Sequence, residues 1–342
     1  MNAEVLKKTA KQMVAPGKGI IAADESSSTC QKRFDSVGVP CTEDNRRAYR
    51  QTLFTTQGLS QYVSGVILYD ETIRQETDSG ENFAAYLSEA GILPGIKVDS
   101  GAKDLALHPG EKVTEGLDGL RERLAEYRTF GAAFAKWRAV ITIGQDIPTD
   151  ACIHANAHAM ARYAALCQEA DIVPIVEPEV LIDGDHSLER CYEVTAATLK
   201  KTFEELEGQD ILLEGAILKA SMVIAGKKAA KQSAPKEVAA ATVRCLKENV
   251  PAELAGVVFL SGGQGDEQAT ENLDEMNKLG VQPWPLTFSY SRAIQNPVLK
   301  IWAASPNANI AKAQEALLFR SKMCSLASLG KYSAEMESER PY

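Results

Sequence analysis

Lys219 lies in an apolar stretch, residues 211–224, whose Ile, Leu and Val content is typical of a buried parallel strand. An ammonium group inside such a strand is costly unless other groups compensate its charge. Lys219 therefore either reaches solvent at the end of the strand or has a function. A lysine amine that burial or neighbouring cations keep neutral is a nucleophile that forms a Schiff base with a carbonyl compound. We predict Lys219 as the nucleophile.

Two other apolar runs each carry a pair of charged residues spaced two apart. Lys136 and Arg138 lie in FAKWRAVI, and Glu177 and Glu179 lie in VPIVEPEV. Side chains alternate along a strand, so each pair shares one face. Carboxylates beside a lysine nucleophile can move the proton that removes a carbinolamine hydroxyl as water. The alternative is a buried ion-pair network that catalyses nothing.

Three further segments complete a candidate carbon–carbon lyase site. Asp24 ends the run GIIAAD and is placed to take a hydroxyl proton. Ser261-Gly262-Gly263-Gln264-Gly265 follows an apolar run and precedes a helical pattern, a setting in which backbone N–H groups bind phosphate. Ser291-Arg292 adds a guanidinium group suited to a phosphate. An ordinary tight glycine turn is the alternative for the Ser261 loop.

Eight short apolar runs, each followed by a helical pattern, must position these residues. Such a period predicts an α/β protein with a single-domain (β/α)8 TIM barrel. The domain covers residues 1–332, beginning with a helix over 1–14, and residues 333–342 form a mobile C-terminal tail. An open, doubly wound sheet is the alternative. The barrel is favoured because its active site lies at the C-terminal ends of the strands, where the candidate residues fall. The expected strands are 19–24, 63–70, 91–101, 134–144, 171–181, 211–224, 254–265 and 283–293. A polar run over 25–29 follows the first strand, a glycine-punctuated loop follows the third, and helices are expected from about Pro297 and from about Asn309.

Composition excludes several other classes of protein. The 342 residues carry a formal charge of −9, which argues against nucleic acid or an anionic membrane as a partner. The seven scattered cysteines suggest reduced thiols and a cytoplasmic location, and no apolar run reaches the length of a membrane span. His154 and His158 share a helix face without a third ligand, so we expect no metal. We also expect no cofactor.

Seven motifs occur in an order that resembles class I fructose-bisphosphate aldolase over nearly the whole chain. They are AADES, GIKVD, FAKWR, VEPE, LLEGAILK, FLSGGQ and FSYSRA. The resemblance implies reversible cleavage of fructose 1,6-bisphosphate to dihydroxyacetone phosphate and glyceraldehyde 3-phosphate, a metal-independent lyase reaction of glycolysis and gluconeogenesis. It also implies a cytoplasmic homo-oligomer, with a tetramer common among relatives.

The resemblance assigns roles by matching position. Lys219 is the Schiff-base lysine, Glu177 the acid and base for dehydration, and Asp24 the base at the C4 hydroxyl. Lys136 stabilises developing charge, Glu179 holds the lysines, and the terminal Tyr342 assists proton exchange on the enamine. The C1-phosphate residues are Ser261, Gly262, Ser291 and Arg292, and those toward the C6-phosphate are Ser26, Thr29, Arg33 and Lys97. Arg138 is a further substrate-binding candidate.

This chain departs from the pattern at several places. The loop Ser26-Ser27-Ser28-Thr29 lacks the glycine often found there, and the segment from Ser333 to Tyr342 is short. Ala220-Ser221 follows the lysine where many relatives have Pro-Asn, and Ser291 stands where they often have glycine. Two alternatives remain at this point. One is a Schiff-base aldolase for another sugar phosphate, such as sedoheptulose 1,7-bisphosphate or fructose 1-phosphate. The other is a barrel that acts only as a binding scaffold.

Overall fold

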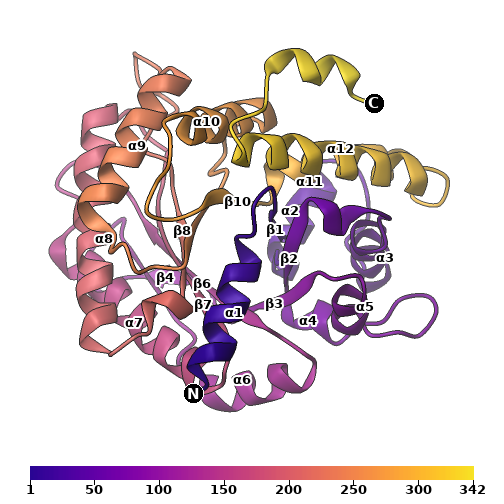
Figure 1. Cartoon of the computed structure of the whole chain (residues 1–342), viewed down its shortest axis with the longest axis horizontal. Helices are drawn as coiled ribbons and strands as arrows, with labels where there is room; N and C mark the ends of the chain where they lie inside the picture. Colours follow the sequence, from indigo (N-terminus) through magenta and orange to yellow (C-terminus); the bar gives the residue numbers. More distant parts are fainter.

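A computed structural model describes residues 1–342 and contains a closed barrel of eight parallel strands ringed by helices (Figure 1). The strand order around the barrel is β1-β10-β9-β8-β7-β6-β3-β2, and β1 pairs with both β2 and β10. Closure confirms the predicted (β/α)8 fold and excludes the open sheet. The strands are β1 Gly19–Ala22, β2 Val63–Leu68, β3 Leu93–Lys97, β6 Phe134–Ile141, β7 Val173–Val180, β8 Ile217–Ala220, β9 Gly256–Phe259 and β10 Leu286–Tyr290.

Helices cover the outside of the barrel. A core of 78 buried residues fills the layer between strands and helices. None of the helices is both long enough and apolar enough to cross a lipid bilayer. The helices are α1 Ala3–Met13, α2 Ser27–Asp35, α3 Glu43–Phe54, α4 Asp70–Ile73, α5 Phe83–Glu89, α6 Leu120–Thr129, α7 Asp150–Glu169, α8 Leu188–Gly208, α9 Pro235–Asn249, α10 Asp266–Lys278, α11 Arg292–Ala304 and α12 Ile310–Ser328.

Helix α1 closes one end of the barrel. Its Leu6, Ala10 and Met13 are spaced along one face and are completely buried against a second core that includes Phe134. Gly95 makes room for that ring, because a Cβ there would lie 2.2 Å from it. The filled end leaves the opposite, C-terminal end of the strands open to solvent, where a site can form.

Strand register brings the charged residues of three strands to one level. Lys97, the last residue of β3, pairs with Lys136, the third residue of β6. Arg138 pairs with Glu177 on β7. Lys136 and Glu177 therefore lie inside long strands, and the expectation that they lie toward the C-termini of their strands is wrong. The stagger of the barrel places Lys136 beside the end of β3 and Glu177 beside Arg138 of β6.

Four local elements differ from the sequence-based expectation. A small antiparallel pair, β4 Ala102–Asp104 and β5 Lys112–Thr114, occupies the expected loop after β3. Helix α2 replaces a polar run, because Cys30 and Phe34 bury one face of it. The strand expected over 211–224 is only Ile217–Ala220, preceded by the 3-10 turn Leu213–Gly215, where Glu214 pairs with Lys7 of α1. Helix α11 begins before Pro297, at Arg292, rather than at the proline.

The C-terminal segment is a 3-10 helix, Ala334–Glu339, packed beside α12 and α10 (Figure 1). Glu337 pairs with the fully buried Arg320 of α12 at 2.6 Å, and Arg340 pairs with Asp266 of α10 at 3.2 Å. These contacts hold residues 333–342 against the barrel in this structure. Whether the segment moves stays a prediction.

Candidate active site

A polar cavity of about 290 Å³ opens at the C-terminal ends of the strands. Only three of its twenty lining residues are hydrophobic, which suits a small charged ligand. Thirteen of the fifteen residues predicted for the site line this cavity, namely Asp24, Ser26, Thr29, Lys97, Lys136, Arg138, Glu177, Glu179, Lys219, Ser261, Gly262, Ser291 and Arg292.

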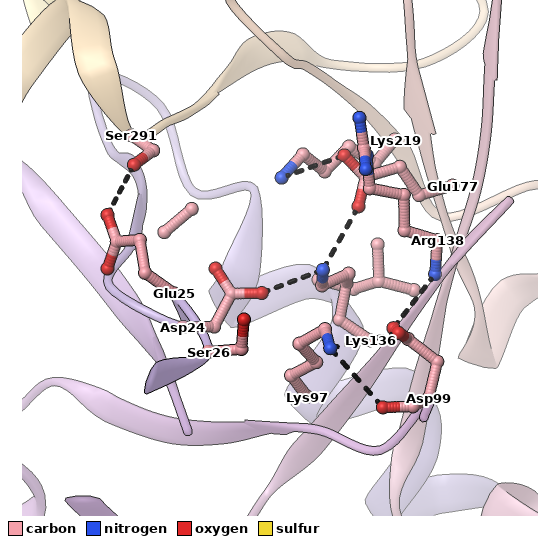
Figure 2. A network of polar contacts seen from close by, with 12 residues as sticks. Asp24, Glu25, Ser26, Lys97, Asp99, Lys136, Arg138, Glu177, Lys219 and Ser291 are labelled. Carbon is pink, nitrogen blue, oxygen red and sulfur yellow. Dashed lines mark hydrogen bonds and ion pairs between the residues drawn. The ribbon is translucent and has the colours of Figure 1, made fainter. Parts of the chain in front are cut away.

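Four buried side chains form a chain of alternating charge across the cavity floor (Figure 2). Lys219 Nζ lies 3.2 Å from Glu177 Oε1, and Glu177 Oε2 lies 3.4 Å from Lys136 Nζ. Lys136 Nζ in turn lies 2.7 Å from Asp24 Oδ2. Glu177 Oε2 makes no hydrogen bond, although it is buried. Its ionic partner is the Lys136 ammonium, so the Glu177 carboxylate is shared between Lys136 and Lys219.

Charge pairing fixes the ionisation of Asp24 and Lys136. Burial raises the pKa of the Asp24 carboxyl, but the positive charges of Lys136, Lys219 and Lys97 outweigh it and lower that pKa to about 2. Burial lowers the pKa of Lys136, but the negative charges of Asp24 and Glu177 outweigh this effect and raise that pKa above its ordinary value. At neutral pH the floor therefore holds an Asp24 carboxylate against a Lys136 ammonium.

Two further ion pairs flank this chain. Glu179 pairs with Arg138. Burial lowers the pKa of Arg138, but the negative charges of Glu179 and Glu177 outweigh it and raise that pKa. Lys97 Nζ lies 2.9 Å from the buried carboxylate of Asp99. That carboxylate also accepts a hydrogen bond from the backbone N–H of Arg138, 3.3 Å away. Asp99 therefore orients both side walls of the cavity, although the sequence-based site did not include it.

Glu25 is a second residue missing from the sequence-based site. Its carboxylate pairs with Arg33 and with the buried Arg50, whose Nη2 lies 2.8 Å away. Ser291 Oγ donates a hydrogen bond to Glu25 at 2.8 Å. Burial raises the pKa of Glu25, but Arg33 and Arg50 outweigh it and lower that pKa. Its place beside Asp24 was the only signal available, since Arg50 lies in a distant helix.

The loop after β9 has the shape expected of an anion site. Gly262 and Gly263 have φ values of +52° and +87°, and the N–H of Gln264 bonds to the carbonyl of Ser261 at 2.9 Å. Such a turn suits glycine and turns backbone N–H groups outward. Arg292, the first residue of α11, is exposed beside it and has no carboxylate partner. The loop and Arg292 together form a cationic end of the cavity.

Two predicted site residues do not line the cavity. Arg33 lies behind it, paired with Glu25 and 3.4 Å from Ser291 Oγ. Tyr342 packs against α12, with the centre of its ring 6.3 Å from that of Phe319. Arg33 therefore contacts the cavity lining through Glu25 and Ser291 in this arrangement. The role of Tyr342 requires the tail to leave its present position and stays a prediction.

We expect Asp24 to stabilise the fold at neutral pH and to lose this effect in acid. Its pKa in the folded chain, about 2, lies below the ordinary value of 3.8. A carboxyl with a lowered pKa stabilises the fold above its unfolded pKa, and the stabilisation disappears as pH falls toward its folded pKa. The shift corresponds to about 2 kcal/mol. The difference in unfolding free energy between wild type and Asp24→Asn should therefore shrink by about 2 kcal/mol between about pH 5 and pH 2.

Chemical denaturation at a series of pH values measures this difference. Asp44→Asn, at an exposed position in the first turn of α3, controls for the loss of a surface carboxylate. A difference for Asp24→Asn that stays constant with pH would show that the carboxyl is not held ionised by its neighbours.

The fold and the cavity define a class: a (β/α)8-barrel enzyme with a buried lysine, paired carboxylates and a cationic end for an anionic ligand. A family model described as fructose-bisphosphate aldolase class-I matches residues 5–341. A protein of Xanthomonas campestris pv. campestris named "Probable fructose-bisphosphate aldolase class 1" is 62% identical over 97% of this chain and 99% of that protein. The cytosolic fructose-bisphosphate aldolase 4 of Arabidopsis thaliana is 50% identical over 94% of this chain and 82% of that protein.

A solved structure of fructose-bisphosphate aldolase from Plasmodium falciparum, in complex with TRAP and a small-molecule inhibitor, superimposes with a TM-score of 0.95. It is 48% identical and covers 97% of this chain and 96% of its own. The chain belongs to the class I fructose-bisphosphate aldolase family. It is a metal-independent lyase that cleaves fructose 1,6-bisphosphate reversibly to two triose phosphates, a reaction of glycolysis and gluconeogenesis.

Proposed function

We propose that this cleavage proceeds through a Schiff base on Lys219, with Glu177 as its proton shuttle. The observation that carries the proposal is the contact between Lys219 Nζ and Glu177 Oε1 at 3.2 Å, in a cavity that both residues line. Oε1 can receive a proton from the lysine, and both Lys219 and Glu177 line the ligand cavity. This geometry suits an amine that must become neutral and then lose water.

The first steps form the iminium ion. The neutral Lys219 amine attacks the C2 carbonyl, and the resulting carbinolamine holds a hydroxyl at C2. Glu177 delivers a proton to that hydroxyl, which leaves as water, and a carbon–nitrogen double bond forms. The positive iminium replaces the positive lysine, so the charge balance with Glu177 is kept. The iminium then acts as an electron sink.

Cleavage uses Asp24 as the base. Its carboxylate takes the proton of the C4 hydroxyl, the C3–C4 bond breaks, and the electron pair moves into the iminium to give an enamine and free glyceraldehyde 3-phosphate. The cations that keep Asp24 ionised also make it a weak base. Proton transfer must therefore be coupled to electron flow into the iminium. Lys136, 2.7 Å from Asp24, stabilises the charge that shifts during this step.

The two ends of the cavity suit the two phosphates. The C1 phosphate lies at the loop after β9, with Ser261, Gly262 and Arg292 as ligands. The Ser291 hydroxyl already donates to Glu25, so Ser291 contributes through its backbone. The C6 phosphate lies toward the opposite wall, with Arg138 beside the sugar chain between them. The residues at that wall are Ser26, Thr29 and Lys97, with Arg33 behind them.

Three proposals concern the chain outside the cavity. Tyr342 reaches the enamine when residues 333–342 leave α12, and this movement makes the segment a mobile tail beside the catalytic domain of residues 1–332. The enzyme acts as a homo-oligomer, as a tetramer by family resemblance. It works in the cytoplasm, which the cytosolic Arabidopsis relative supports.

Borohydride trapping tests the covalent proposal directly. The protein is incubated with fructose 1,6-bisphosphate in the presence of EDTA, reduced, and digested for peptide mass spectrometry. We expect a reduced triose or hexose phosphate adduct on Lys219 and on no other lysine, because the ion pairs of Lys136 with Asp24 and Glu177 raise its pKa and keep it protonated. An adduct on Lys136, or none at saturating substrate, would contradict the assignment.

A further inference from the structure

Lys227 lies beside the loop after β9 although it is far from that loop in sequence. It follows β8, and hydrogen bonds fix the backbone around it to the segment after β7. The N–H of Gly226 donates to the carbonyl of His186 at 2.9 Å, and the N–H of Lys227 donates to that of Ile182 at 2.9 Å. This anchoring directs the Lys227 side chain toward the neighbouring strand end, where β9 gives way to the glycine turn.

The ammonium group of Lys227 lies over the bare backbone of Gly263. A Cβ at Gly263 would come within 2.6 Å of Lys227 Nζ and within 3.5 Å of Arg292 Nη2. The two cationic nitrogens are therefore within about 6 Å of each other. Two cations held this close repel unless an anion compensates them. Gly263 adjoins Gly262, which lines the cavity together with Arg292, so Lys227 lies next to the cationic end of the cavity.

The present partner of Lys227 is a weak one. Asp183 lies 3.2 Å away, and both side chains are largely exposed, at 44% for Lys227 and 70% for Asp183. Exposed ion pairs of this kind contribute little free energy. A phosphate dianion beside Arg292 would attract the ammonium group more strongly, because it carries more charge and three acceptor oxygens. The lysine can exchange partners without any change in its backbone.

We propose that Lys227 is a further substrate-binding residue, which leaves Asp183 and contacts the C1 phosphate when substrate binds. The inference rests on the proposed phosphate site at Ser261, Gly262 and Arg292. The competing interpretation is that Lys227 and Asp183 only tether two loops to each other. The two interpretations differ in what removal of Asp183 should do.

Dihydroxyacetone phosphate is the probe, because it keeps the C1 phosphate and the reactive carbonyl and lacks the C6 phosphate. The readout is the concentration that gives half-maximal borohydride-trapped adduct on Lys219, which reports binding rather than turnover. Lys227→Met should raise this concentration about tenfold, or ~1.4 kcal/mol, and added salt should shrink the difference from wild type. Lys231→Met, in the same loop but paired with Glu237, should leave it unchanged.

Two other variants decide between the interpretations. Asp183→Asn should bind the probe as well as wild type or more tightly, since Lys227 loses only a competing partner. A defect in Asp183→Asn equal to that of Lys227→Met would establish the tether and overturn the proposal. Arg292→Ala should weaken binding at least tenfold. If Arg292→Ala weakens binding and Lys227→Met does not, the inference about Lys227 is wrong, and if neither does, the phosphate site itself is wrong.

Discussion

Replacing Lys219 with Met is expected to lower kcat for cleavage of fructose 1,6-bisphosphate by at least about 10³-fold. The variant removes the only proposed nucleophile and keeps a side chain of similar length in a position where Lys219 is 4% exposed. Glu177 retains Lys136 as an ionic partner at 3.4 Å, so its charge is not left alone. The fold should therefore survive while the covalent step is lost.

Steady-state cleavage and borohydride trapping measure this effect together. No adduct should form at position 219, and the thermal midpoint should stay within a few degrees of wild type. Lys247→Met removes an exposed lysine on α9 and should keep full activity. Activity above about a tenth of wild type in Lys219→Met would refute the covalent mechanism, whatever the trapping result.

Asp24→Asn is expected to lower kcat by about 10²- to 10⁴-fold while Schiff-base formation persists, because general base catalysis contributes that much and acts only after the iminium exists. The amide keeps the shape of the carboxyl and can still accept a hydrogen bond from Lys136, 2.7 Å away in the wild type. It cannot take the C4 hydroxyl proton. Substrate should therefore accumulate on Lys219 as an uncleaved iminium.

Single-turnover trapping with fructose 1,6-bisphosphate distinguishes the two steps. Mass spectrometry should find a hexose bisphosphate adduct in Asp24→Asn, whereas the wild type also yields the triose phosphate adduct. A variant that forms neither adduct would place Asp24 in iminium formation instead of cleavage. Equal loss of kcat in Lys219→Met and Asp24→Asn, with trapping absent in both, would lead to the same reassignment.

The two variants separate roles that the ion-pair chain links. Lys219, Glu177, Lys136 and Asp24 contact one another in sequence along the cavity floor (Figure 2). A defect in one member changes the field at the others, so their effects on rate are not additive. Trapping is informative because it reports one covalent step at a time.

Several features could be predicted from the sequence because they depend on local patterns. Apolar runs alternating with amphipathic segments predict a parallel sheet covered by helices, since strands buried on both faces need continuous hydrophobic residues. The position of the charged residues then favoured a barrel over an open sheet. The spacing of Lys136 with Arg138 and of Glu177 with Glu179 determined that each pair shares a face, and all four line the cavity. Lys219 could be predicted as functional because burying an amine in an apolar strand costs free energy unless other groups compensate its charge.

One helix boundary was predicted wrongly from a local feature. Pro297 suggested a helix start, because proline favours the first turn. Helix α11 begins five residues earlier, since Ile294, Val298 and Trp302 bury one face of it in the core. Tertiary packing outweighed the local preference of the proline.

What the tertiary structure alone decided is which charges meet. Strand stagger sets Lys136 beside Lys97, and closure of the barrel brings Glu25, Arg50 and Ser291 together from three distant segments. Lys227 reaches Gly263 because β8 and β9, the strands that precede them, are paired in the barrel. A sequence lists charged residues, but the interaction between two charges depends on the distance between them and on the solvent that folding removes. The sequence therefore determined the fold and the kinds of residue in the site, and folding decided their partners.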